Sequence, residues 1–156
     1  MTTPAGSPFS FEDLRRAPDV EGPNLVAVDA SDRLLLDEAA DLLAAAKPGE
    51  VVVIGDHYGA LTLGALAQHH LQGLRVYQDP LVAELALAGN AERAARAGLD
   101  GTYPSGDLDA DLVRGARVVL LALPRGLAAL DEIAALIAAH AAPDVVLLAG
   151  GRLKHM

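Results

Sequence analysis

A short apolar segment, residues 50–55 with the sequence EVVVIG, constrains the fold more than any other part of the chain. Its four central residues are all β-branched, and no polar residue interrupts them. A run of this kind is typical of a parallel strand that is covered on both faces. Because helices must supply both covers, the segment predicts the centre of a layered α/β domain.

Strand-like and helix-like segments alternate on either side of this run. The spacing of apolar residues predicts a helix that Ser31 or Asp32 caps and that Lys47-Pro48-Gly49 ends. Residues 101–115 are predicted to form a loop. Further strands are predicted at residues 24–30, 74–78, 116–123 and 145–149, and further helices at 59–71, 80–97 and 127–142. This alternation predicts a doubly wound, mostly parallel sheet with helices on both faces.

Residues 1–23 differ from the rest of the chain in composition. They contain four prolines among polar residues and one small apolar group, which includes Phe9 and Phe11. Proline at this density is unfavourable for helices and central strands. We therefore expect an N-terminal arm that docks on the body of the domain through its two phenylalanines.

Composition limits the class of function. A chain of 156 residues is long enough for one domain with a buried core, while a net charge of −9 opposes binding to polyanions unless a basic patch is local. The absence of cysteine excludes disulfides and thiolate metal sites, and we expect no metal. Residues 127–142 are too few to span a bilayer, and the first eleven residues lack the pattern of a secretory signal. We expect a cytoplasmic protein with no membrane partner.

The carboxyl ends of the strands are where a sheet of this kind binds ligands. The turn after residue 54 contains Gly55, Asp56 and Gly59, and Asp79 follows the next strand about twenty residues later. This is half of a nucleotide-binding pattern, in which glycines admit the ligand and an acidic residue accepts hydrogen bonds from ribose hydroxyls. The alternative is that Asp56 and Asp79 each cap the helix that follows, as aspartate commonly does.

Four segments together resemble a known family. They are residues 51–62, 79–86 with Asn90, 121–130 and 148–156. Their order and spacing are similar to the N-terminal half of two-domain ribosomal RNA guanine-N2 methyltransferases, the large-subunit methyltransferase G and small-subunit methyltransferase C type. The resemblance covers about residues 24–156 and implies a Rossmann-like fold of the S-adenosylmethionine-methyltransferase kind.

The resemblance also implies a division of labour between two domains. In that family the second domain binds S-adenosylmethionine and carries an Asn-Pro-Pro-Phe motif, and the first is a degenerate copy that helps to recognise RNA. This sequence has no such motif, and the corresponding strand ends in Leu123-Pro124-Arg125. We therefore expect residues 24–151 to be a degenerate domain without catalytic residues or cofactor. Residues 152–156 would begin a linker to a C-terminal catalytic domain that holds S-adenosylmethionine.

Ribosomal RNA and the C-terminal catalytic domain are the partners that the resemblance implies. Arg125, Arg152 and Lys154 lie on the predicted carboxyl edge and could contact phosphate groups, which would position RNA without reading its sequence. Arg152 and Lys154 could equally contact the other domain. Arg93 and Arg96 are better explained by pairing with nearby acids such as Glu92.

Two other functions remain open at this point. The chain could be a self-sufficient enzyme that binds S-adenosylmethionine or a nucleotide through Asp56, Gly59 and Asp79. It could instead be a scaffold or dimerisation module without a small ligand. The absence of an acceptor motif disfavours the enzyme, and the net negative charge disfavours an independent RNA binder. The sequence does not indicate an oligomeric state.

Overall fold

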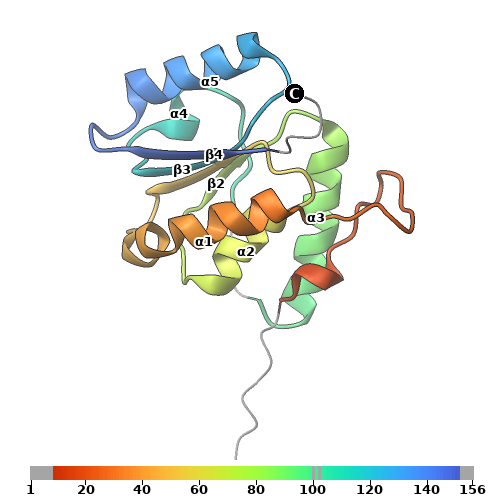
Figure 1. Ribbon diagram of the computed structural model, residues 1–156. Coiled ribbons are helices and arrows are strands. Elements are labelled where there is room, and N and C mark those ends of the chain that lie inside the picture. The colour runs from red at the N-terminus through yellow and green to blue at the C-terminus, as the bar shows by residue number, and fades with distance from the viewer. Residues whose placement is uncertain (1–8, 100, 102, 152–156) are drawn as a thin grey trace, which may run out of the picture.

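The computed structural model describes residues 9–99, 101 and 103–151. Helices cover both faces of a central sheet (Figure 1). The elements follow in the order η1 (Phe11–Asp13), α1 (Ala30–Ala45), β1 (Val51–Ile54), α2 (Ala60–Gln68), β2 (Arg75–Tyr77), α3 (Leu81–Arg96), α4 (Ala110–Val113), β3 (Val118–Ala122), α5 (Leu127–His140) and β4 (Val146–Gly150).

The sheet has the strand order β2-β1-β3-β4, and every neighbouring pair is parallel. Side chains alternate between its faces as the pleat requires. Val51 and Val53 of β1 belong to the core shared with α1 and α2, while Val52 and Ile54 belong to the core shared with α4 and α5. Both cores are built almost entirely from Leu, Val, Ile and Ala. The predicted Rossmann-like α/β fold with helices on both faces is confirmed.

The two outer strands differ in how they are covered. The outer edge of β2 pairs with residues 104–106, because the amide of Val76 donates to Pro104 and the amide of Gly106 donates to Val76. β4 has β3 as its partner on one side, and its own residues Val146 and Leu147 are exposed. Among the described residues, no helix is both long and apolar enough to cross a membrane.

The predicted strand at 24–30 is wrong. No strand is present there, and α1 begins at Ala30 instead. Asp29 is the N-cap: its side chain accepts from the Ser31 amide, and the Asp32 side chain accepts from the Asp29 amide at 2.9 Å. The cap predicted at Ser31 or Asp32 is therefore wrong, because this reciprocal capping box starts the helix two or three residues earlier. Within the predicted loop 101–115, Asp109 likewise caps the short helix α4.

The arm docks through its phenylalanines, as predicted. Phe9 and Phe11 lie edge to face with ring centroids 5.3 Å apart, and both pack against the α1–α2 core. Gly64 of α2 makes room for this contact, since a β-carbon there would lie 3.1 Å from the Phe11 ring and 2.6 Å from Leu36. The guanidinium of Arg33 stacks on the Phe11 ring, 4.5 Å from its centroid. The arm is therefore part of the folded body from Phe9 onward.

Candidate functional site

The turn after β1 is built around the carboxylate of Asp56. This side chain is 1% exposed, and it accepts hydrogen bonds from the amides of Gly59 (3.2 Å), Leu61 (3.4 Å) and Thr62 (2.9 Å). These amides belong to the first turn of α2, where unpaired N–H groups and the helix dipole favour an anion. In nucleotide-binding folds a ligand can supply that anion. Here the protein's own carboxylate occupies the position, which agrees with the capping interpretation of Asp56.

The glycines of this turn make room for protein atoms. Gly59 has a φ of +104°, and a β-carbon there would lie 2.9 Å from Cδ1 of Leu87 on α3. Gly55 has a φ of +82°, and a β-carbon there would lie 2.9 Å from the carbonyl oxygen of Ala122. Both positions need glycine for their backbone conformation and for close packing. A close approach by a ligand is not required to explain either of them.

Asp79 lies at the same edge of the sheet but has a different environment. It is exposed and accepts a hydrogen bond from the Tyr77 hydroxyl at 3.3 Å. Burial raises the pKa of Tyr77, and the negative charge of Asp79 adds to this effect. Asp79 does not cap α3, whose N-cap is Pro80 without a side-chain hydrogen bond. The capping interpretation is therefore wrong for Asp79, and its carboxylate remains accessible from solvent.

A buried glutamine connects the two halves of the predicted nucleotide pattern. Gln78 donates to the backbone carbonyl of Asp56 at 2.7 Å and to that of Ala83 at 3.0 Å. It thereby ties the turn after β1 to the first turn of α3. This bridge lies between the segments that a nucleoside would have to contact, and it holds them together through protein hydrogen bonds alone.

Asn90 fastens the arm to the body, and sequence reasoning did not assign it that role. It is 2% exposed, in the middle of α3. Its Oδ1 accepts from the amide of Arg15 at 2.9 Å, and its Nδ2 donates to the carbonyls of Arg15 (2.9 Å) and Tyr58 (2.6 Å). The guanidinium of Arg93 also donates to Oδ1. A sequence signal existed, because Asn90 is the one polar residue among Ala83, Ala86, Leu87 and Ala94 on the buried face of this helix.

A second set of contacts holds the arm at the same place. The Tyr58 hydroxyl donates to Asp19 at 2.6 Å, and Arg16 stacks on the Tyr58 ring at 4.9 Å from the centroid. Arg16 also pairs with Asp19 at 3.3 Å. The Tyr58 hydroxyl is the main reason why the pKa of Asp19 lies below its usual value, and the Val20 amide adds to the effect. The arm thus closes over the turn that follows β1.

The basic residues predicted from the sequence to bind RNA or to pair with acids differ in where the structure places them. Arg125 follows β3, is exposed, and makes no hydrogen bond or ion pair with any other described residue. Arg152 and Lys154 lie outside the described residues. Arg96 pairs with Glu92 at 2.5 Å, as predicted, whereas Arg93 donates to Asn90. Of the three RNA candidates, Arg125 is the one whose position the structure gives.

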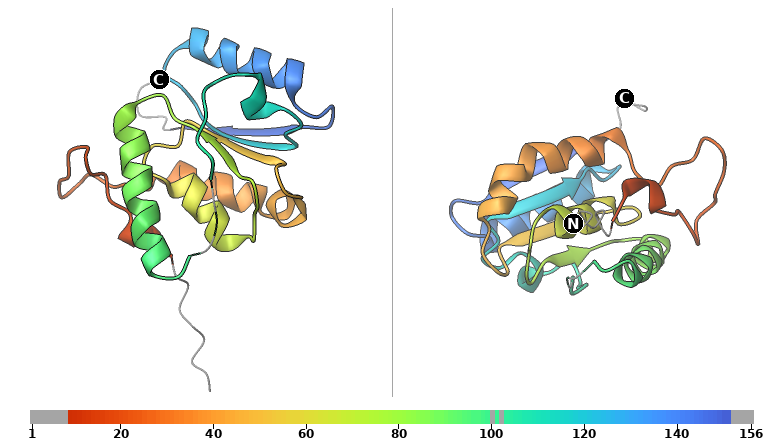
Figure 2. Two further views of the ribbon diagram at one scale, coloured as in Figure 1. Left: turned by 180° about the vertical axis from the view of Figure 1, so that it is seen from behind. Right: turned by 90° about the horizontal axis from the view of Figure 1, so that it is seen from below.

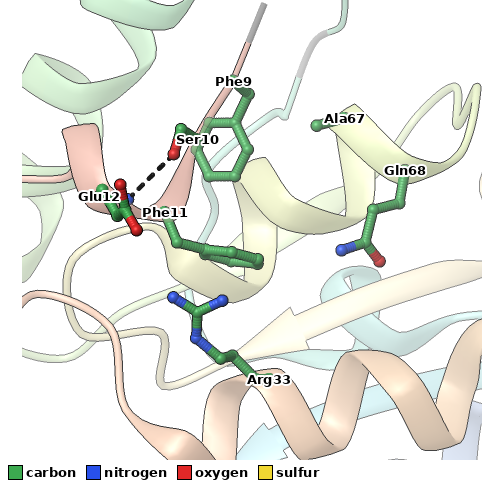
Figure 3. A pocket seen from close by; sticks show the side chains of 7 residues that line it. All are labelled: Phe9, Ser10, Phe11, Glu12, Arg33, Ala67 and Gln68. Carbon is green, nitrogen blue, oxygen red and sulfur yellow. Dashed lines mark hydrogen bonds between the residues drawn. The ribbon is translucent and has the colours of Figure 1, made fainter. Parts of the chain in front are cut away.

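Two cavities in the described part of the structure are lined by the arm. One, of about 250 Å³, lies between Phe9, Phe11, Arg33 and Gln68 (Figure 3). The other, of about 310 Å³, lies between the arm and α3. Neither is lined by Asp56, Gly59 or Asp79. No group of three or more His, Asp or Glu side chains suited to a metal is present within the same residues.

Known relatives of the chain are ribosomal RNA methyltransferases. Ribosomal RNA large subunit methyltransferase G of Pseudomonas paraeruginosa is 32% identical over 151 residues, and the same protein of Pseudomonas entomophila is 31% identical over 159. Each match covers 96% of this chain but 38% of the relative. The chain therefore spans well under half the length of these proteins.

Solved methyltransferase structures share the fold. The T. thermophilus 16S rRNA N2 G1207 methyltransferase, solved with AdoMet and guanosine, superposes with a TM-score of 0.59 at 24% identity over 78% of this chain and 34% of that one. The precorrin-6y C5,15-methyltransferase of Geobacter metallireducens also gives a TM-score of 0.59, at 11% identity over 83% of this chain and 66% of that one. At these identities the likeness establishes the fold alone.

A family model decides the relationship. The model described as the RLMG N-terminal domain matches residues 3–156, which is nearly the whole chain. This agrees with the resemblance read from the sequence, with the relatives and with the shared fold. The chain therefore belongs to the RLMG N-terminal domain family.

Proposed function

We propose that this chain is the non-catalytic N-terminal domain of an S-adenosylmethionine-dependent ribosomal RNA guanine-N2 methyltransferase. In this proposal residues 1–23 are an arm, 24–151 form a degenerate methyltransferase-like domain, and 152–156 begin a linker. The domain helps to recognise RNA and packs on the catalytic domain that follows it. The function of the relatives, which are ribosomal RNA methyltransferases, supports this assignment. A substrate of this kind also supports a cytoplasmic location.

The observation that carries the proposal is the position of Asp56. Its carboxylate accepts three amide hydrogen bonds at the start of α2 and is 1% exposed. A cofactor at that place would have to displace a buried carboxylate from its donors, which is costly. The packing of Leu87 against Gly59 gives a second reason, because it leaves little room beside the turn. We therefore assign no cofactor to this domain and expect S-adenosylmethionine in the C-terminal domain.

Contacts with RNA would be made through Arg125, Arg152 and Lys154. Arg125 supports this role because its guanidinium is exposed and makes no ion pair among the described residues. With a net charge of −9, the whole chain does not attract RNA at long range, so such contacts would add to those of the catalytic domain. They would bind phosphate and place the RNA in register.

Isothermal titration calorimetry of this chain with S-adenosylmethionine tests the proposal. We expect no binding heat at millimolar ligand, because the carboxylate of Asp56 already occupies the anion position at the start of α2. Micromolar binding that Asp79→Ala abolishes would refute a degenerate site and favour the self-sufficient enzyme. Asp79→Ala suits this purpose because the residue is exposed and accepts one hydrogen bond, from Tyr77. Its loss would remove a ribose contact with little effect on the fold.

A further inference from the structure

Large apolar side chains gather at one edge of the molecule. Eleven such side chains are exposed among the described residues, and eight of them lie at the carboxyl ends of the strands or in the loop beside them. Two belong to the segment after β3: Leu123, 45% exposed, and Leu127, 79% exposed. Single exposed leucines are normal on protein surfaces, but a group at one edge indicates an interaction site.

The start of α3 contributes three more of these residues. Leu81 and Leu85 are 66% and 50% exposed, and Val82 is 40% exposed. Leu81 and Leu85 lie four positions apart, so they share one face of the helix. That face is opposite the one on which Leu87 and Asn90 are buried. These leucines therefore make no contribution to the core of the domain.

The loop of residues 15–26, here called the edge loop, supplies Val20, Leu25 and Val26. Figures 1 and 2 show this orange-red loop projecting on the side where α3 begins and where β4 ends. The loop is held in shape by its own polar groups. Glu21 accepts from the amides of Arg16 (2.7 Å) and Ala17 (2.9 Å), and Arg16 donates to the Val20 carbonyl at 2.8 Å.

The edge loop is also fixed to the body, at its two sides. Tyr58 binds Asp19 through its hydroxyl, and Asn90 binds both backbone groups of Arg15. A loop that is tied at several points presents its exposed apolar side chains in one conformation. Such preorganisation lowers the entropy lost when a partner binds. Val20, which is 68% exposed, is therefore displayed as part of a prepared surface.

We propose that this apolar carboxyl edge is the surface on which the C-terminal part of the family's chains docks. The inference rests on the proposed function and adds the location of the contact. The described chain ends at this same edge: β4 runs to Gly150, and Gly151 lies beside Leu123, whose β-carbon would be 3.5 Å from a β-carbon added at Gly151. Polypeptide that continues from there starts next to the apolar group. The Pseudomonas relatives have well over half their length outside the match, which is ample for a docked domain.

Docking at this edge has a consequence for RNA binding. The crevice that holds the ligand in nucleotide-binding sheets becomes a contact between protein domains. Its apolar centre suits a protein partner, because protein interfaces have an apolar core and a polar rim, whereas nucleic acid requires positive charge. Arg125 comes two positions after Leu123 and then lies at the rim, where it can reach RNA that passes along the junction of the two domains.

Hydroxyl-radical footprinting tests the location, since it measures the exposure of individual side chains. This chain alone is compared with a protein in which it continues into the part of the Pseudomonas paraeruginosa relative that lies outside the match. We expect labelling of Leu81, Leu85 and Leu127 to fall roughly fivefold in the longer protein, because interface cores are as tightly packed as protein interiors. Leu147 is the internal control: it is 40% exposed and lies near the start of β4, at the opposite end of the strands, so its labelling should not change.

A double variant, Leu81→Gln with Leu127→Gln, adds a second measurement. In the longer protein it should restore the labelling of Leu85, whereas Leu147→Gln should not. Unchanged labelling of all three leucines would refute the docking surface, and so would equal protection of Leu147. Protection that is already present in this chain alone and is lost on dilution would assign the edge to a second copy. Neither RNA nor cofactor is present, so these outcomes are independent of the calorimetric test of the proposed function.

Discussion

Replacement of Asn90 by alanine should detach the arm from α3 and destabilise the domain. The change removes three hydrogen bonds of normal length, two to the backbone of Arg15 and one to the Tyr58 carbonyl, together with the contact from Arg93. A hydrogen bond contributes about 0.5–1.5 kcal/mol net, and backbone groups left unpaired and buried cost more. The Arg15 groups are only partly buried, so water can replace some of the lost bonds. We expect the free energy of unfolding to fall by about 2–3 kcal/mol.

Urea denaturation followed by circular dichroism measures this loss. For a chain of this size the expected change corresponds to a decrease of about 4–12 °C in the melting temperature. Limited trypsin digestion gives a local measurement, because cleavage after Arg15 and Arg16 should become faster once the arm is released. Arg96→Ala is the matched control on the same helix, where it removes an exposed ion pair with Glu92 worth at most about 1 kcal/mol. If the free energy of unfolding of Asn90→Ala differs by less than about 0.5 kcal/mol from that of the unchanged chain, the anchoring role assigned to Asn90 is wrong.

Two further changes test the candidate site and the pH dependence. Asp56→Ala leaves three buried amides at the start of α2 without an acceptor, so the free energy of unfolding measured by urea denaturation should fall by about 2–4 kcal/mol. Asp79→Ala, at an exposed position, should change it by no more than about 0.5 kcal/mol. Equal effects of the two changes would contradict the capping role of Asp56. Burial lowers the pKa of His69 below its ordinary value of 6.5, so the unfolded chain binds the proton more tightly and stability should decrease as the pH falls below about 6.5. His69→Gln should flatten this decrease in urea midpoints measured between pH 7.5 and 5.5, and His70→Gln, at an exposed position, should not.

The order of strands and helices followed from local patterns. Runs of β-branched and apolar residues located β1 and β3, because a strand buried on both faces tolerates few polar side chains. The same rule failed at residues 24–30, which are not part of the sheet. The capping box formed by Asp29 and Asp32 was the better local signal, and it starts α1.

The candidate site could be located but not interpreted from the sequence. Asp56, Gly59 and Asp79 were correctly expected at the carboxyl edge of the sheet. Whether Asp56 faces a ligand or the amides of α2 depends on side-chain direction, which the order of residues leaves open. The structure turns it toward the amides of Gly59 and Thr62. The same limit applied to Asp79, which could have capped α3 and does not.

The sequence by itself therefore determined the layered α/β class, the family, and the edge at which the candidate site residues lie. Periodicity and motif spacing are local properties, so they can be recognised in the sequence alone. Only the tertiary structure decided what those residues contact. Asn90 and Arg15 are 75 positions apart in the sequence and meet because α3 packs beside the arm. The exposed leucines of α3 and of the segment after β3 lie at one edge because β2 and β3, the strands that precede them, run in the same direction. Contacts between distant segments depend on how the elements pack together, which no single segment encodes.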